Sequence, residues 1–228
     1  SRRTCFCGYV VNHDTGHNAE PRPAEFNRAG RSRPVVLATT GGGEDGFALL
    51  LNFIEAAAGA PWQGVAIAGP MTPEHELSFL RAKATAAGVF LHTFIPRMPA
   101  LFGSIDALVC MGGYNTLTEA AWQAVPTVCV PRVVPRTEQL IRARAFERLG
   151  ILKMLHPDVL DATSLRACVE SALTTPRAQV RDNVEAALNF DGARRAAQEL
   201  LALASTPAPA PQPLTTTPVP QVLATATP

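Results

Sequence analysis

The sequence has no uninterrupted apolar segment of the length needed to cross a bilayer, which is about 20 residues. It also has little imbalance of charge, because its formal net charge is only +1. A balanced charge supplies no global attraction to nucleic acid or to an anionic membrane surface. We therefore expect no nucleic-acid partner and no transmembrane segment. These absences predict a cytoplasmic protein and leave a peripheral association with the membrane open.

Cysteine is scarce, with five in 228 residues. The number is odd, and Cys110 and Cys129 lie inside apolar runs, which is typical of reduced packing residues and not of a disulfide framework. Cys5 and Cys7 form C-x-C ahead of an H-x-x-x-H pair, but this spacing departs from the usual zinc-binding C-x-x-C. The sequence also contains no Asp-x-Asp. We predict no metal and no cofactor.

The composition divides the chain into three parts. Residues 1–33 are arginine-rich and lack apolar periodicity, so they are predicted to be a linker or the remnant of an interdomain segment. Residues 205–228 are uncharged and rich in Pro, Thr and Ala, a composition that buries too little apolar surface to fold and predicts a disordered tail. Residues 34–204 carry most of the apolar content and are predicted to form one domain.

Apolar runs of strand length alternate with helix-like segments in this domain. The runs are 35–39, 65–68, 89–93, 107–111, 127–130 and 151–155. The helix-like segments are 47–58, 73–87, 98–104, 117–124, 137–149, 164–173 and 192–202. Strands that are continuously apolar are buried on both faces of a parallel sheet. The pattern predicts an α/β fold with a doubly wound, Rossmann-like parallel sheet.

The first glycine loop, "LATTGGGEDGFALL", contains G-x-G-x-x-G at Gly41, Gly43 and Gly46. A dinucleotide-binding loop also needs an acid about 20 residues later, at the end of the second strand. That strand ends in Gly69 and Pro70, and no Gly-Lys-Ser/Thr of a phosphate-binding P-loop follows the glycines. The loop is therefore interpreted as a strand-to-helix turn, in which at least one glycine needs a positive φ.

The loop after the fourth strand has more chemical content. In "GYNTLTE", residues 113–119, Asn115 or Thr116 is predicted to cap a helix whose first turn presents free N–H groups. Glu119 lies four residues after Asn115, on nearly the same face. Free N–H groups for a phosphate beside a carboxylate for a ribose diol suit a nucleoside diphosphate.

"GYNTLTE" resembles the G-[W/Y]-N-[S/T]-x-x-E signature in the C-terminal, donor-binding half of GT-B glycosyltransferases. The resemblance is closest to the UDP-glycosyltransferases and to the family that contains the GlcNAc transferase of peptidoglycan lipid II synthesis. Two further stretches, "HTFIPRMPALFGSIDALVCMGG" and "VPTVCVPRVVPRTEQLIRA", are similar to the base-contacting loop and the acid-Gln loop of these enzymes. Together the matches cover roughly residues 34–173. They imply a metal-independent transferase that uses UDP-hexose or UDP-N-acetylhexosamine as donor.

The resemblance also implies a role in donor binding for particular residues. The backbone near Phe94 and Ile95 would contact the base, and Glu119 would take the ribose hydroxyls. Glu138 and Gln139 would hold hydroxyls of the donor sugar. The residues facing the phosphates and the cleft would be Thr40, Gly41, Gly42, Gly43, Gly112, Gly113, Asn115 and Thr116.

Two departures from the plant-type pattern affect the phosphate contacts. Met111 stands where those enzymes have a phosphate-directed His, and Arg142 stands where they often have Asn. We therefore expect an arginine to contact the donor phosphates, with Arg136 as the candidate site residue and Arg132 as the alternative.

The resemblance places the general base in an N-terminal domain, which residues 1–33 are too few to form. The catalytic residues of this chain are accordingly unknown, and the isolated half is expected to be inactive. Its partners would be the nucleotide-sugar donor and an N-terminal GT-B half, either in the same chain or in a separate protein as in the two-subunit GlcNAc transferase of dolichol-linked oligosaccharide synthesis. A non-catalytic nucleotide-sugar-binding module and a UDP-sugar 2-epimerase-like protein are the alternatives.

Overall fold

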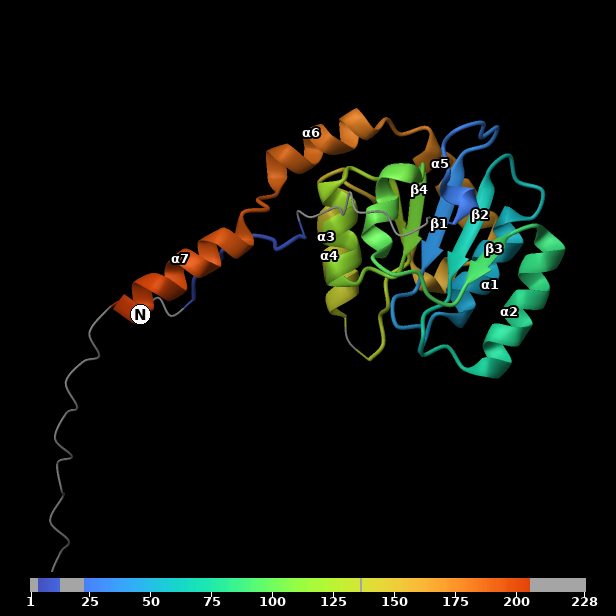
Figure 1. Ribbon diagram of the computed structural model, residues 1–228, viewed down its shortest axis with the longest axis horizontal. Helices are drawn as coiled ribbons and strands as arrows, with labels where there is room; N and C mark the ends of the chain where they lie inside the picture. The colour runs from blue at the N-terminus through green and yellow to red at the C-terminus, as the bar shows by residue number, and fades with distance from the viewer. Residues whose placement is uncertain (1–3, 13–22, 136, 206–228) are drawn as a thin grey trace, which may run out of the picture.

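A computed structural model describes residues 4–12, 23–135 and 137–205. Over these residues the chain builds a six-stranded sheet in which all neighbouring strands are parallel, in the order β3-β2-β1-β4-β5-β6 (Figure 1). The strands are β1 Val35–Thr39, β2 Gln63–Ile67, β3 Phe90–His92, β4 Ala107–Cys110, β5 Thr127–Cys129 and β6 Lys153–Met154. The predicted doubly wound parallel sheet is confirmed.

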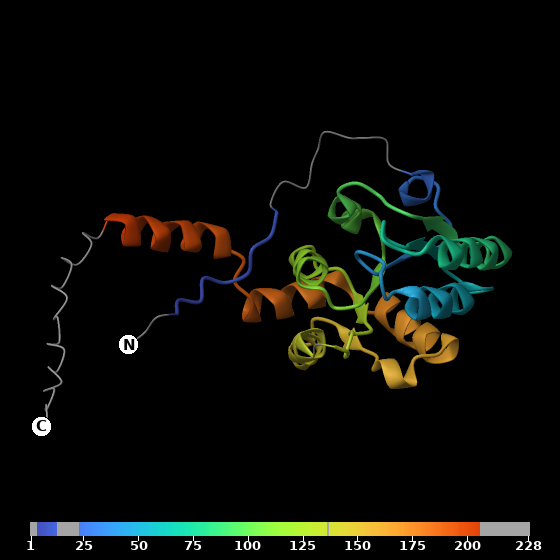
Figure 2. The ribbon, with the colours of Figure 1, turned by 90° about the horizontal axis from the view of Figure 1, so that it is seen from below.

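Helices cover both faces of the sheet (Figure 2). The first face is covered by α1 Phe47–Ala57, α2 Glu74–Ala87 and α5 Ala162–Leu173. The second face is covered by the 3-10 helix η2 Met98–Ser104 with α3 Tyr114–Trp122, α4 Glu138–Arg148 and α6 Arg177–Ala187. The remaining described helices are η1 Ala24–Phe26, η3 Pro157–Val159 and α7 Gly192–Ser205.

The alternation of side chains along β1 divides the core into two layers. Val36 and Ala38 pack on the first face, whereas Val35 and Leu37 pack on the second. All five residues of β1 are buried, as expected for a strand with neighbours on both edges and helices on both faces. The core therefore lies on both sides of β1, the inner strand at which the strand order of the sheet reverses.

Three features of the fold differ from what the sequence indicates. Helix α6 is not predicted, because Val180 and Val184 are its only buried residues and its other positions are mostly polar. Phe26, inside the segment interpreted as a linker, is buried in the second layer of the core. Ser205, placed in the tail, is the last residue of α7. Residues 206–228 lie outside the described part of the chain.

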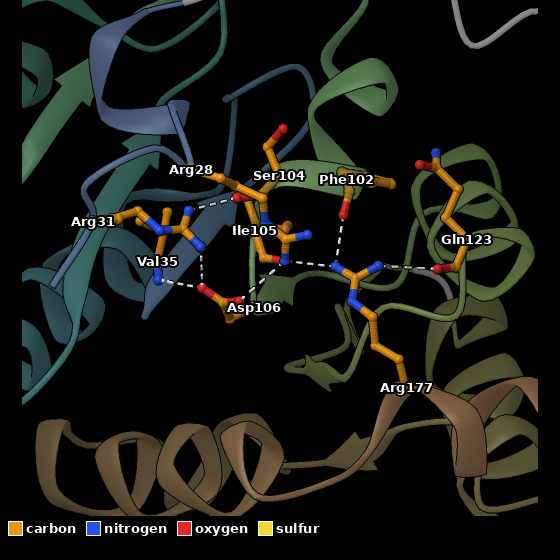
Figure 3. A network of polar contacts seen from close by, with 9 residues as sticks. All are labelled: Arg28, Arg31, Val35, Phe102, Ser104, Ile105, Asp106, Gln123 and Arg177. Carbon is orange, nitrogen blue, oxygen red and sulfur yellow. Dashed lines mark hydrogen bonds and ion pairs between the residues drawn. The ribbon is translucent and has the colours of Figure 1, made fainter. Parts of the chain in front are cut away.

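The amino ends of β1 and β4 are held by a polar network (Figure 3). Asp106 accepts hydrogen bonds from the backbone N–H of Val35 and from Arg31, each through Oδ2. Arg177, at the start of α6, donates to the carbonyl oxygens of Phe102, Ile105 and Gln123. Burial lowers the pKa of Arg177 from its usual value. The network anchors α6 at the edge of the sheet opposite the carboxyl ends of the strands.

Helix α7 projects away from the sheet, and residues 4–12 run beside it in both views (Figures 1 and 2). The backbone N–H of Tyr9 donates to the carbonyl of Asn189, and the N–H of Gly192 donates to the carbonyl of Tyr9. The Tyr9 ring also contacts Phe146 and Phe190. The described N-terminal segment is thus joined to the start of α7 and to the second face of the domain.

Replacing Arg177 with Met tests the anchoring of α6. The substitution keeps an unbranched apolar stem but removes the donor to three carbonyl groups. We expect the free energy of unfolding to fall by about 3 kcal/mol, because each partly buried carbonyl that loses its donor costs about 1 kcal/mol. Urea unfolding measures the change. Arg181→Met, one turn further along α6, is the matched control, and an equal loss in both variants would contradict the assignment.

The carboxylate that caps the N-terminus of α5 should make the stability of the domain depend on pH. The Asp161 carboxylate accepts a hydrogen bond from the Ser164 backbone N–H, which lowers the pKa of Asp161 below its usual 3.8. A carboxyl whose folded-state pKa is depressed contributes stability above the unfolded-state pKa and loses it as the pH falls through the folded-state value. We expect the stability difference between the wild-type chain and Asp161→Asn to shrink as the pH falls below the usual carboxyl pKa of 3.8. A difference in urea midpoint that is independent of pH would contradict this.

Candidate functional site

A cleft opens where the order of the sheet reverses, between the carboxyl ends of β1 and β4. From β1 the chain turns to α1 on the first face, and from β4 it turns to α3 on the second face. Ligands of open α/β sheets bind at such a switch point. The cavity there has a volume of about 250 Å³. It is lined by Thr39, Thr40, Gly41, Gly42, Gly43, Glu44, Asp45, Cys110, Met111, Gly113, Thr116, Arg132 and Gln139.

The first glycine loop forms one wall of this cavity. Gly41 and Gly43 have φ values of 71° and 97°, so the prediction that at least one glycine needs a positive φ is confirmed. A Cβ on Gly43 would lie 2.3 Å from Thr72 Oγ1, which leaves no room for a side chain. Gly46, the third glycine of the pattern, is the N-cap residue of α1 with an ordinary φ of −89°. The loop is thus a close-packed turn.

The beginning of α3 forms the opposite wall. Gly112, with φ 85°, turns the chain after β4, and Gly113 is the N-cap residue. The first helical hydrogen bond runs from the N–H of Leu117 to the carbonyl of Gly113. The prediction that Asn115 or Thr116 caps the helix is therefore wrong, because the glycine turn starts the helix before them.

With Gly113 as the N-cap residue, this wall still presents free backbone N–H groups. Asn115 and Thr116 occupy the second and third positions of α3, and their N–H groups precede the first helical hydrogen bond. Free N–H groups in the first turn, together with the helix dipole, make a helix N-terminus favourable for anions. Thr116 lines the cavity, whereas Asn115 is exposed beside it.

The third side of the cleft comes from the segment between β5 and α4. The guanidinium of Arg132 forms an ion pair with Asp45 at 2.8 Å. The side-chain oxygen of buried Gln139 accepts a hydrogen bond from the Arg132 backbone N–H at 3.2 Å. Arg142 donates to the carbonyl of Gly112 at 2.7 Å, so the residue that replaces Asn supports the turn before α3. Arg136 lies outside the described residues.

Glu119 lies one turn along α3 and is engaged by the N-terminal segment. Its Oε1 accepts a hydrogen bond from the backbone N–H of Asn12 at 3.1 Å. Nearby, the hydroxyl of Tyr114 accepts a hydrogen bond from the N–H of Val10 at 3.0 Å. Glu119 does not belong to the cavity lining. Sequence reasoning missed this contact because backbone donors from a distant segment leave no residue pattern.

The other predicted site residues lie farther from the cavity. Phe94 is 61% exposed, and Ile95 is buried in the second layer of the core. Both lie between β3 and η2, and η2 packs against α3. Glu138 is exposed at the first position of α4, next to buried Gln139. The cleft lining therefore contains the predicted phosphate-facing residues except Gly112 and Asn115, together with the predicted sugar residue Gln139. The predicted base residues, Glu119 and Glu138 do not line it.

A larger cavity, of about 520 Å³, lies between α3 and α6. Its walls include Trp122 and Phe190, whose rings are 5.3 Å apart. Because α3 runs back from the carboxyl edge of the sheet, its last residues, Ala121 and Trp122, place this cavity away from the switch point. The smaller cleft is the candidate functional site because the glycine loop and a helix N-terminus converge there.

Comparison with known proteins identifies the chain. The model of the glycosyltransferase family 28 C-terminal domain matches residues 42–200. The chain belongs to this family. The predicted relationship to the donor-binding half of GT-B glycosyltransferases is thus confirmed, and the matched region contains the cleft lining from Gly42 onward.

Curated relatives of the family 28 domain are about twice its length. The NDP-glycosyltransferase YjiC of Bacillus licheniformis is 27% identical over 171 residues, which are 74% of this chain and 41% of the relative. A UDP-N-acetylglucosamine–N-acetylmuramyl-(pentapeptide) pyrophosphoryl-undecaprenol N-acetylglucosamine transferase of Acidithiobacillus ferrooxidans is 28% identical over 159 residues, or 66% and 43%. The chain spans about half the length of the relatives it matches.

Solved structures agree on the fold. The calicheamicin glycosyltransferase CalG4 aligns with a TM-score of 0.62 at 27% identity, over 78% of this chain and 45% of that one. MurG of Acinetobacter baumannii aligns with a TM-score of 0.64 at 16% identity, over 80% and 55%, and at that identity it supports the fold alone. The family 28 domain thus has the C-terminal fold of a GT-B glycosyltransferase.

Two buried thiols lie at the carboxyl ends of β4 and β5, and one of them, Cys110, lines the cleft. Cys110 and Cys129 are paired in register on β4 and β5, and both are free and buried, which confirms the prediction of reduced packing residues. The hydrogen bond with Cys110 and burial raise the pKa of Cys129 well above its usual value. The Cys129 thiol therefore stays neutral at ordinary pH. Its Sγ would lie 3.0 Å from a Cβ on Gly112, a tight contact that adds to the preference for glycine set by the φ of 85°.

Residues 4–12, 23–135 and 137–205 contain neither a metal-binding cluster nor a membrane-spanning helix. Within these ranges no group of three or more His, Cys, Asp or Glu side chains is arranged to hold a metal ion. No helix in the same ranges is long and apolar enough to cross a membrane.

Adding a methyl group to the glycine loop of the family 28 domain tests its packing. Gly43→Ala and Gly41→Ala both place alanine at a positive φ, which costs about 1–2 kcal/mol. Only at Gly43 does the new Cβ also meet Thr72 and the carbonyl of Ala68, because nothing lies within 4 Å of Gly41. We expect Gly43→Ala to lower the urea midpoint clearly more than Gly41→Ala. Equal midpoints would show that the loop relaxes around the methyl group.

Proposed function

We propose that the chain is the donor-binding half of a glycosyltransferase that uses a UDP-linked hexose or N-acetylhexosamine. The observation that carries the proposal is the cleft at the switch point, in which the glycine loop faces the N-terminus of α3. Free N–H groups and a helix dipole at one wall favour a diphosphate there. The relatives that act on NDP-sugars and UDP-N-acetylglucosamine agree with this assignment.

The remaining donor contacts are assigned around the diphosphate. Phe94 and Ile95 lie on the carboxyl side of β3, where their backbone can meet the base. Glu119, one helical turn from Asn115, takes the ribose hydroxyls with its carboxylate. A carboxylate accepts several hydrogen bonds, so the bond from Asn12 to Oε1 leaves capacity for the ribose. Glu138 and Gln139 hold the donor sugar.

Transfer in this proposal needs no metal ion. The leaving UDP gains negative charge as the glycosidic bond breaks, and fixed donors aimed at that charge lower the barrier. The N–H groups of the first turn of α3 and the guanidinium of Arg132 are such donors. The base that deprotonates the acceptor, and the acceptor site itself, belong to an N-terminal GT-B half in the same chain or in a partner. The isolated half is inactive in this account.

Calorimetry with UDP, GDP and NAD tests donor binding by the chain. We expect UDP to bind weakly and more tightly than NAD. Glu119→Ala is expected to weaken UDP binding by about tenfold or more, because a hydrogen bond to a charged group is lost. NAD binding that equals or exceeds UDP binding would contradict the glycosyltransferase proposal.

A matched ligand separates the ribose contact from a structural role of Glu119. The wild-type chain should bind UDP more tightly than 2′-deoxy-UDP, and Glu119→Ala should remove this preference. Glu170→Ala, on α5, is the control at an exposed acid away from the cleft and should leave both affinities unchanged. Equal losses for the two nucleotides in Glu119→Ala would assign the residue to packing with the N-terminal segment.

A further inference from the structure

An ion pair crosses the cleft and joins its two outer walls. Asp45 comes from the loop between β1 and α1, and Arg132 comes from the segment after β5. Strand β4 lies between β1 and β5, so the pair spans two strand spacings, about 10 Å. Both residues line the cavity. The contact therefore lies over the carboxyl end of β4, in front of the turn that leads into α3.

The backbone of Arg132 is fixed while its side chain reaches across. Its N–H is held by the side-chain oxygen of Gln139 at 3.2 Å and lies 3.3 Å from the carbonyl of Met111. The contact to Asp45 joins one guanidinium nitrogen to one carboxylate oxygen. An arginine can offer a planar pair of donors to a phosphate, which is a stronger arrangement than a single contact. The Arg132 backbone is thus fixed by hydrogen bonds, whereas its guanidinium is held by a single contact.

The exposure of the Asp45–Arg132 ion pair allows Arg132 to exchange Asp45 for another anion. The Arg132 side chain is 34% exposed and the Asp45 side chain is 42% exposed. Ion pairs with this much access to solvent contribute little net stability, because water screens them. A diphosphate carries more negative charge than one carboxylate and can accept both guanidinium donors at once. An anion that enters the cleft therefore competes effectively with Asp45 for Arg132.

The charges in the cavity show why the exchange matters. Among the charged side chains that line it, Glu44 and Asp45 are negative and Arg132 is positive. A diphosphate that entered without moving Arg132 would meet an acidic loop on one side and the N-terminus of α3 on the other. Moving the guanidinium onto the phosphates places positive charge opposite the helix N-terminus. The carboxylate of Asp45 is then left to water at the open side of the cleft.

We propose that Asp45 and Arg132 form an exchangeable gate at the diphosphate subsite. In the empty cleft, Asp45 positions the Arg132 guanidinium above the end of β4. When a nucleoside diphosphate binds, Arg132 leaves Asp45 and pairs with the phosphate oxygens, and it returns to Asp45 when the nucleotide leaves. Asp45 is thus a positioning residue that competes with the nucleotide for Arg132 and limits its affinity. This inference rests on the proposed function of the same cleft.

Calorimetry on the full chain with UDP and with uridine tests the gate. Asp45→Asn should tighten UDP binding about threefold, because a competitor of the strength of an exposed ion pair is removed. Arg132→Gln should weaken UDP binding about tenfold or more, because a charged hydrogen bond to phosphate is lost. Arg132→Lys should recover only part of that loss, since lysine is a point charge. None of these substitutions should change the affinity for uridine, which has no phosphate.

The double variant separates exchange from simple repulsion. When Arg132 is already Gln, Asp45→Asn should no longer tighten UDP binding, because Asp45 then has no guanidinium to compete for. Glu44→Gln is the matched control, since it removes the same charge from the neighbouring position of the same loop. Its effect on UDP affinity should be much smaller than that of Asp45→Asn.

Three changes in UDP affinity would each overturn the gate. They are weaker UDP binding in Asp45→Asn, equal tightening in Glu44→Gln, and tightening by Asp45→Asn that persists in the Arg132→Gln background. A UDP affinity that is unchanged by both Asp45→Asn and Arg132→Gln would overturn the gate and leave the proposed function intact. If the wild-type chain bound neither UDP nor uridine, the proposed function would fail and the gate would fail with it.

Discussion

The parallel pairing of β1 with β4 is the contact on which the rest of the domain depends. Leu37 faces Leu108, and Thr39 faces Cys110, so the two strands end side by side at the same edge. Because their following helices lie on opposite faces, the loops after them must separate. The cleft is a consequence of this separation and not of any particular side chain. The glycines then allow the two loop backbones to approach whatever occupies it.

The opposite edge of the sheet keeps this pairing rigid. Asp106 joins the amino ends of β1 and β4 through the N–H of Val35, while Arg177 ties α6 to the segment that precedes β4. Asp106 and Arg177 at that edge thus already make hydrogen bonds within the domain. At the carboxyl edge, by contrast, the N–H groups of Asn115 and Thr116 and the half-exposed ion pair of Arg132 are available for exchange with a ligand. One edge therefore holds the domain together and the other can bind.

The sequence predicted the sheet well because its strands are continuously apolar and the turns after them contain glycine or proline. It predicted the cleft because Thr40 and the glycines on one side, and Thr116 and Gln139 on the other, follow strand ends. It placed the start of α3 too late, since a glycine turn with free N–H groups carries no capping side chain. It missed α6 and the bonds from Val10 and Asn12, because such contacts depend on tertiary packing and on backbone donors.

We propose that the switch-point cleft, and not the larger aromatic cavity, binds the nucleotide. Amide hydrogen exchange of the chain with and without UDP tests it most directly, because bound ligand slows the opening of the backbone it contacts. We expect slower exchange in residues 40–46 and 111–117, with exchange in residues 184–191 beside Trp122 unchanged. Protection confined to residues 184–191, or UDP binding without protection of the two loops of the cleft, would contradict it.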